Sequence, residues 1–232
     1  MALPSVCAVI VAAGSSQRMG FDKLTAPVAG KPLLAHTLAA FQACPEVQRI
    51  VLVCAAERIS EFETLATKEG ISKLEKIVAG GSERHESVWH GLQATSPEYE
   101  IIAVQDAARP LITAAQITLC IEAAAVHGAA SLAEPVTDTL QRADAFQRIA
   151  ENVDRRRLWR MQTPQVFRRE LLLEAYRKVL EGDEIITDET TAVQSAGHDV
   201  FLVENRDWNI KVTTPRDLAV VEFLLKERVS ST

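Results

Sequence analysis

Short apolar runs, often rich in β-branched residues, alternate with helix-like segments up to residue 136. The apolar runs cover residues 6–13, 49–55, 76–80, 100–107 and 129–136, and the helix-like patterns lie near 32–43, 57–69, 83–94 and 113–127. Continuously apolar strands are buried on both faces, which is typical of a parallel sheet covered by helices on each side. The alternation therefore predicts an α/β fold with a doubly wound, mostly parallel sheet, and ligands at the carboxyl ends of its strands. A single domain over residues 1–232 is expected from the length.

The alternation lapses at residues 136–160, which are mostly polar and rich in Thr, Asp, Arg and Gln. Such a segment buries little apolar surface alone, so we expect a protruding β-hairpin arm that packs on a partner. A long surface loop is the alternative. Beyond the arm, the pattern predicts helices near 169–181 and 188–196, strands over 199–205 and 209–213, and a helix from Pro215 to about Arg228.

The charge balance and the cysteine spacing argue against several classes of protein. The chain has 25 Lys and Arg against 31 Asp and Glu, and its densest basic run covers only residues 155–157. Nucleic acid is therefore not an expected partner. The four cysteines are far apart without a Cys-x-x-Cys pair, which favours reduced thiols and a cytoplasmic protein. The apolar run at the amino terminus is too short to span a bilayer, so no membrane partner is expected.

The loop after the first apolar run, AAGSSQRMGFDK, combines small residues with two cations. It is neither a Walker A loop nor a Gly-x-Gly-x-x-Gly dinucleotide fingerprint. The small residues Ala12, Ala13 and Gly14 let backbone N–H groups approach a ligand closely. Arg18 and Lys23 bring two positive charges to the same loop. We therefore predict a polyphosphate site at this strand end, with solvated surface cations as the alternative.

Eight motifs, in this order, carry a resemblance to a known family. They are AAGSSQRMGFDK (12–23), GKPLLAHTL (30–38), GGSERHESVWHGL (80–92), QDAARP (105–110), VDR (153–155), TPQ (163–165), TDE (187–189) and NIKVT (209–213). With them the chain resembles the 2-C-methyl-D-erythritol 4-phosphate cytidylyltransferases over nearly its whole length. The resemblance implies a Rossmann-like nucleotidyltransferase fold. It also implies CMP transfer from CTP to methylerythritol phosphate, with Mg²⁺, in non-mevalonate isoprenoid synthesis.

The resemblance implies roles for residues on the nucleotide side of the site. Arg18 and Lys23 match the family's catalytic stabilisers of the transition state, although the loop before Lys23 is shorter here and lacks the usual Pro and Gln. In the family, the loop that includes Gly81 and Ser87 holds the cytosine. An ordinary glycine turn that caps a helix at Ser82 is the alternative. The full set of implied nucleotide contacts is Ala12, Ala13, Gly14, Gly81 and Ser87.

Asp106 ends a predicted strand, and a carboxylate at a strand end beside phosphates is a natural Mg²⁺ ligand. The alternative is an N-cap for the helix that follows. The resemblance also implies that Asp106 binds substrate, together with Arg109, Thr139, Thr163 and Thr187. For Thr187, an N-cap ahead of two acidic residues is the alternative.

Arg155 and Lys211 complete the catalytic residues that the resemblance implies. In the family, the hairpin that carries Thr139 and Arg155 crosses to a second subunit, which implies a homodimer through the arm. Lys211 matches the lysine that orients the incoming phosphate. A lysine that protects an edge strand from aggregation is the alternative.

Three other functions fit parts of this pattern. A ribitol 5-phosphate cytidylyltransferase would keep the chemistry and change the acceptor. A non-catalytic nucleotide-binding module would be expected to lack Arg18, Lys23 or Asp106, and all three are present. A Rossmann dehydrogenase is disfavoured because its glycine fingerprint is missing.

Overall fold

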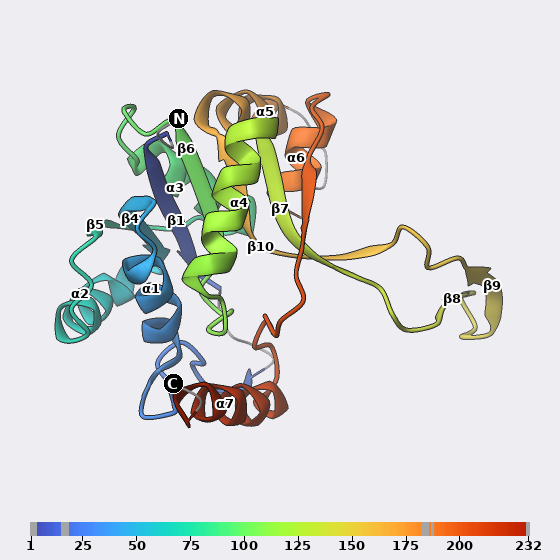
Figure 1. Cartoon of the computed structure of the whole chain (residues 1–232), viewed down its shortest axis with the longest axis horizontal. Helices are drawn as coiled ribbons and strands as arrows, with labels where there is room; N and C mark the ends of the chain where they lie inside the picture. Colours follow the sequence, from blue (N-terminus) through green and yellow to red (C-terminus); the bar gives the residue numbers. More distant parts are fainter. Residues whose placement is uncertain (1–3, 15–18, 182–185, 187, 231–232) are drawn as a thin grey trace.

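The computed structural model describes residues 4–14, 19–181, 186 and 188–230. Its centre is a seven-stranded sheet with the order β11-β7-β10-β6-β1-β4-β5 (Figure 1). The strands are β1 (Val6–Ala12), β4 (Val47–Cys54), β5 (Leu74–Ala79), β6 (Ile101–Asp106), β7 (Ala129–Pro135), β10 (Trp159–Arg168) and β11 (Phe201–Glu204). Within the described residues, β10 alone runs antiparallel to its neighbours in this sheet. The predicted α/β fold with a mostly parallel sheet is confirmed.

Helices cover both faces of the sheet. They are α1 (Leu33–Ala43), α2 (Ile59–Lys68), α3 (Arg84–Ala94), α4 (Ala114–His127), α5 (Arg169–Glu181), α6 (Glu189–Ser195) and α7 (Pro215–Ser230), with a short 3-10 helix at Ala56–Arg58. In the central strand β1, Ala8 and Ile10 belong to an apolar cluster with buried residues of α1, α2, α4 and α7. Cys7 and Val9 face the other way and pack with α3, α5 and α6. None of the helices in the described ranges is long and apolar enough to cross a bilayer.

Helix α3 lies unusually close to the sheet at Gly91. A Cβ atom at this position would lie 2.4 Å from Cγ1 of Val9 and 2.7 Å from Cγ2 of Val53. Both valines are fully buried in the sheet, so only glycine allows this approach. The contact fixes the distance between α3 and the strands β1 and β4. It therefore also fixes the position of the loop that precedes α3.

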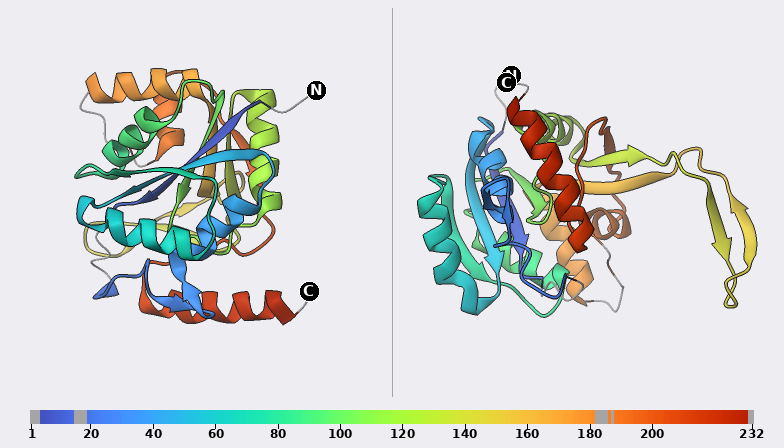
Figure 2. Two further views of the ribbon diagram at one scale, coloured as in Figure 1. Left: turned by 90° about the vertical axis from the view of Figure 1, so that its left-hand side faces the viewer. Right: turned by 90° about the horizontal axis from the view of Figure 1, so that it is seen from below.

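The polar segment after β7 forms a hairpin that projects from the body of the molecule (Figures 1 and 2). Its strands, β8 (Leu140–Ala143) and β9 (Ile149–Val153), pair antiparallel in a sheet of their own. A second small sheet pairs β2 (Pro27–Val28) with β3 (Lys31–Pro32). The predicted arm is confirmed as a hairpin rather than a surface loop, although β10 already begins at Trp159.

Strand β10 was not predicted from the sequence. It carries Pro164 among the polar residues Gln162, Thr163 and Gln165, and a proline normally argues against a central strand. In the structure, the pairing of β10 with β7 shifts between Met161 and Gln165. Pro164 lies within this irregular stretch, so the strand tolerates it.

The segment NIKVT contains no strand, so the prediction of a short strand there is wrong. Its backbone groups form hydrogen bonds with residues outside the sheet. The N–H of Val212 donates to the carbonyl of Ala108. The carbonyls of Asn209 and Val212 accept hydrogen bonds from the side chains of Arg109 and Lys23. The segment is therefore tied to the loops that follow β6 and β1.

Candidate active site

The ends of β1 and β6 and the loop between β5 and α3 meet at one edge of the sheet. Val11 of β1 pairs with Asp106, the last residue of β6, so the two strand ends lie side by side. A pocket of about 280 Å³ opens there, and we call it the first pocket. The predicted site residues that line it are Ala12, Ala13, Gly14, Lys23, Gly81, Ser87, Asp106 and Lys211. The structure thus brings all five predicted nucleotide contacts together with three of the predicted charged residues.

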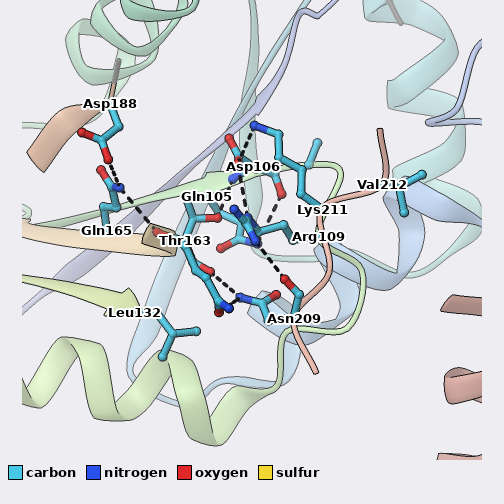
Figure 3. Close-up of polar contacts among 12 residues, drawn as sticks. Gln105, Asp106, Arg109, Leu132, Thr163, Gln165, Asp188, Asn209, Lys211 and Val212 are labelled. Carbon is cyan, nitrogen blue, oxygen red and sulfur yellow. Dashed lines mark hydrogen bonds and ion pairs between the residues drawn. The ribbon is translucent and has the colours of Figure 1, made fainter. Parts of the chain in front are cut away.

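Asp106 is the centre of the charged part of this site (Figure 3). Its carboxylate is buried among three cations: Lys211 Nζ lies 2.9 Å and Arg109 Nε 3.3 Å from Oδ2, and Arg84 Nη2 lies 3.4 Å from Oδ1. Burial alone would raise the pKa of Asp106, but Arg84, Lys211 and Arg109 together hold it below its usual range. Asp106 is therefore ionised at physiological pH. Thr113 caps the next helix, α4, so the alternative role of Asp106 as that cap is wrong.

A second pocket of about 570 Å³ adjoins the same charged cluster. Arg109 and Lys211 line it, together with Gln162, Asn209 and Trp208 among others. The guanidinium of Arg109 donates to the carbonyl oxygen of Asn209 at 2.8 Å, which holds it in place. Lys211 lines both pockets. Lys211 therefore lies where the two pockets meet, with its ammonium group 2.9 Å from Asp106.

Thr163 supports Asp106 from the neighbouring strand. It is buried on β10, and its Oγ1 accepts a hydrogen bond from the backbone N–H of Asp106 at 3.1 Å. Its carbonyl accepts from Nδ2 of Asn209 at 2.9 Å. Thr163 therefore links the end of β6 to the NIKVT segment (Figure 3). It lines neither of the two pockets, so its direct contact with a substrate stays a prediction.

Lys23 reaches the first pocket from the loop after β1. Its Nζ donates to the carbonyl of Val212 at 3.0 Å, beside Lys211 in the chain. The two lysines that were predicted from motifs far apart in the sequence therefore line the same pocket. Arg18 and Thr187 lie outside the described residues, and their predicted roles in binding and catalysis are untested. The alternative role of Thr187 as an N-cap is wrong, because Asp188 caps α6.

The loop before α3 is packed so closely at Gly80 and Gly81 that these two glycines admit no side chain. A Cβ on Gly80 would lie 2.6 Å from Cβ of Ala13, and a Cβ on Gly81 would lie 2.4 Å from Cβ of Glu86. The buried hydroxyl of Ser87 accepts from the N–H of Gly81 at 3.1 Å. The first pocket therefore has a wall of backbone on this side, which suits the flat face of a base.

Thr139 and Arg155 are not brought to the Asp106 cluster within one subunit. Both flank the β8–β9 hairpin, which projects away from the sheet (Figure 2). They line neither of the two pockets, and the guanidinium of Arg155 donates to the carbonyl of Thr137. Their predicted roles would require a second subunit, and they stay predictions.

Two residues at this site were missed by the sequence analysis, Arg84 and Glu189. Arg84 is the first residue of α3, which is capped by Glu83 rather than by Ser82. Its Nη1 lies 2.6 Å from Oε1 of Glu189, and its Nη2 donates to Oε2 at 2.9 Å. Burial alone would lower the pKa of Arg84, but Glu189 and Asp106 outweigh it and raise the pKa. Both residues stand inside quoted motifs, yet their sequence positions give no sign that they pair.

Comparisons with known proteins agree with this geometry. A family model described as 2-C-methyl-D-erythritol 4-phosphate cytidylyltransferase matches residues 6–227. A protein of that name from Caldanaerobacter subterraneus is 42% identical over 96% of this chain and 100% of its own length. Another from Alkaliphilus metalliredigens is 40% identical over 96% of this chain and 94% of its own.

Solved structures give the same picture. The crystal structure of 4-diphosphocytidyl-2C-methyl-D-erythritol synthase from Anaerococcus prevotii superposes with a TM-score of 0.85 and 26% identity, covering 96% of each chain. That of 2-C-methyl-D-erythritol 4-phosphate cytidylyltransferase from Thermus thermophilus gives a TM-score of 0.77 and 29% identity, covering 94% of this chain and 98% of the other. The structural likeness therefore covers most of the length of this chain.

Proposed function

Because this chain belongs to the 2-C-methyl-D-erythritol 4-phosphate cytidylyltransferase family, we propose that it transfers CMP from CTP to 2-C-methyl-D-erythritol 4-phosphate. The products are 4-diphosphocytidyl-2-C-methyl-D-erythritol and pyrophosphate, in non-mevalonate isoprenoid precursor synthesis. The observation that carries the proposal is the first pocket. Five predicted nucleotide contacts line it together with Lys23, Asp106 and Lys211.

In this reaction a phosphate oxygen of the acceptor attacks the α-phosphorus of CTP. A new P–O bond forms, and the bond from the α-phosphorus to the bridging oxygen of the leaving pyrophosphate breaks. The attacking oxygen is already ionised near neutral pH, so no residue has to remove a proton. The contribution of the protein is to position two anions against each other and to neutralise their charge.

Lys211 is suited to this role because it lines both pockets. With CTP in the first pocket and the acceptor in the second, its ammonium group would hold the acceptor phosphate against the α-phosphate. Asp106 pairs with both Lys211 and Arg109, and so fixes the position of Lys211 beside the acceptor pocket. Lys23, with Arg18 from the adjacent loop, would stabilise the charge that develops at the α-phosphorus.

Mg²⁺ is part of the proposal as a partner of Asp106. Mg²⁺ is commonly bound by one or two carboxylates together with substrate phosphates and water, and an ionised carboxylate at the strand end fits that pattern. No group of three or more acidic, His or Cys side chains that could hold a metal occurs in the described part of the chain. Asp106 would therefore be the ligand from the protein, and the triphosphate would supply the others. When bound, the ion would neutralise negative charge on the phosphates.

A homodimer through the arm is also part of the proposal. The hairpin exposes Phe146 and Ile149, which are 78% and 75% accessible in the single chain. Apolar side chains at the tip of an isolated hairpin favour a covering partner. A second copy would also bring Thr139 and Arg155 toward an acceptor pocket, where they have the predicted role of binding methylerythritol phosphate.

A cytoplasmic location is supported by the thiols. Cys7, Cys44, Cys54 and Cys120 are all free and buried, as expected for a protein kept in a reducing compartment. Cell fractionation with an antibody to the protein would test this proposal.

The test of the function is a pyrophosphate-release assay on the purified chain. Each of the four nucleoside triphosphates is offered with Mg²⁺ and methylerythritol phosphate, and ribitol 5-phosphate is offered as the competing acceptor. Turnover with CTP and methylerythritol phosphate is expected. A preference for ribitol 5-phosphate would mean that the proposed acceptor is wrong. If no pair of nucleotide and acceptor releases pyrophosphate, the proposed reaction is refuted.

A further inference from the structure

Glu189 is a fully buried carboxylate at the first turn of α6. It accepts hydrogen bonds from both terminal nitrogens of Arg84, and from the hydroxyl of Tyr176 at 3.0 Å. A buried carboxylate is costly unless it is paired and hydrogen-bonded, and this one is. Glu189 does not itself line the first pocket, so any effect on a ligand passes through the guanidinium that it holds.

Arg84 connects Glu189 to the first pocket. It lines that pocket and not the second one. Its contact with Asp106 is through Oδ1, whereas Arg109 and Lys211 contact Oδ2. The Asp106 carboxylate is therefore flanked by Arg84 on the nucleotide side and by Arg109 on the acceptor side.

The pair of hydrogen bonds to Glu189 fixes where the Arg84 guanidinium points. A carboxylate that binds both terminal nitrogens holds the plane as well as the position of a guanidinium. Without that negative charge, Asp106 would be the remaining carboxylate that pairs with Arg84 among the described residues. The guanidinium would then move from the pocket wall toward Asp106, and the nucleotide would lose a preorganised cation.

We propose that Arg84 is a nucleotide-binding residue and that Glu189 is the positioning residue that holds its guanidinium on the wall of the CTP pocket. This inference rests on the proposed function and adds to it a link between α6 and the nucleotide. Because the link passes through one side chain, substitutions at the two positions are coupled rather than additive.

Glu189→Gln tests the inference because it keeps the shape of the side chain and removes its charge. CTP affinity is measured by calorimetric titration without acceptor, and KM is measured for both substrates. The dissociation constant and the KM for CTP are expected to rise about tenfold, the loss of one charge-assisted hydrogen bond. The KM for methylerythritol phosphate should not rise, because Arg84 does not line the acceptor pocket. In an Arg84→Gln background, Glu189→Gln should weaken CTP binding no further.

Tyr176→Phe is the matched control. It removes the other hydrogen bond of Glu189 and keeps the pair with Arg84, so its KM for CTP should equal that of the wild type. If Glu189→Gln does not fold, Arg84→Gln alone carries the test, with the same tenfold weakening expected.

Two results would overturn the inference. One is CTP binding by either variant that stays within about twofold of the wild type, and the other is additive losses in the double variant. A wild-type chain that releases no pyrophosphate would instead refute the proposed reaction. The CTP titrations would then still report on Arg84 and Glu189.

Discussion

Replacing Asp106 with Asn should destabilise the protein in the absence of ligands. The substitution keeps the size of the side chain and removes one negative charge from the centre of three cations. Arg84, Arg109 and Lys211 all lie within 3.4 Å of that carboxylate. The cations stay in place after the substitution, so the stability of the folded state should fall.

The size of this loss of stability depends on which other partners each cation keeps. Removing one partner of a buried ion pair costs about 3–5 kcal/mol. Arg84 keeps its pair with Glu189, and Lys211 has a side chain that is 39% exposed, so solvent screens it. The side chain of Arg109 is only 11% exposed, so of the three cations it loses the most stabilisation. We therefore expect the low end, about 3 kcal/mol, or a fall in Tm of about 6–12 °C for a chain of this size.

Urea unfolding of the unliganded protein measures this loss. The pKa of Asp106 is lower in the folded protein than its ordinary value of 3.8, so its stabilisation is present above that pH and is lost as the pH falls through the folded value. The difference between wild type and variant should therefore be constant from neutral pH to about pH 5 and shrink only in strong acid. Glu174→Gln is the control, because its ion pair with Lys178 is exposed to solvent and should contribute little to stability.

A small effect would refute the reasoning. If Asp106→Asn lowers the free energy of unfolding by less than about 1 kcal/mol at neutral pH, with an unchanged m-value, the three cations do not depend on this carboxylate. Solvent or other acceptors would then have to stabilise them. The description of Asp106 as their shared partner would be wrong.

Four further outcomes are expected. Lys23→Ala and Arg18→Ala should each lower kcat about 10²–10³-fold in steady-state assays, the usual loss for one preorganised electrostatic group. Gly91→Ala should lower the free energy of unfolding by about 1–3 kcal/mol in urea, because its Cβ would lie 2.4 Å from a methyl of Val9. Chelation of divalent metal should abolish pyrophosphate release, and Mg²⁺ should restore it. Phe146→Asp should shift the protein toward a monomer in light scattering and reduce turnover at low protein concentration.

Six of the seven strands of the central sheet, and the meeting of their loops at the first pocket, were predictable because their signals are local. Apolar runs of β-branched residues mark buried strands, and a glycine-bearing loop directly after such a run lies at the end of the strand. Once the sheet is parallel, the loops after β1 and β6 must meet at one edge. The meeting of Gly14 and Lys23 with Asp106 follows from these two facts.

The pairing of Arg84 with Glu189 was not predictable in the same way. The two residues are 105 positions apart, and the contact depends on where the fold places the first turns of α3 and α6. A charged residue inside a polar motif has the same pattern whether it faces solvent or a buried partner. The tertiary arrangement decides between these outcomes, and no periodicity in the sequence reports it.

The strand that the sequence pattern missed is the one that supports Asp106 and the second pocket. β10 lies between β6 and β7, and its polar residues face three different parts of the site (Figure 3). Thr163 accepts from the backbone of Asp106, Gln162 accepts from Asn209, and Gln165 donates to Asp188, the cap of α6. An apolar strand would be easier to recognise, but it would leave these buried polar groups without partners. The polar residues that obscure the strand pattern of β10 are therefore the ones that fix the relative positions of Asp106, the NIKVT segment and α6.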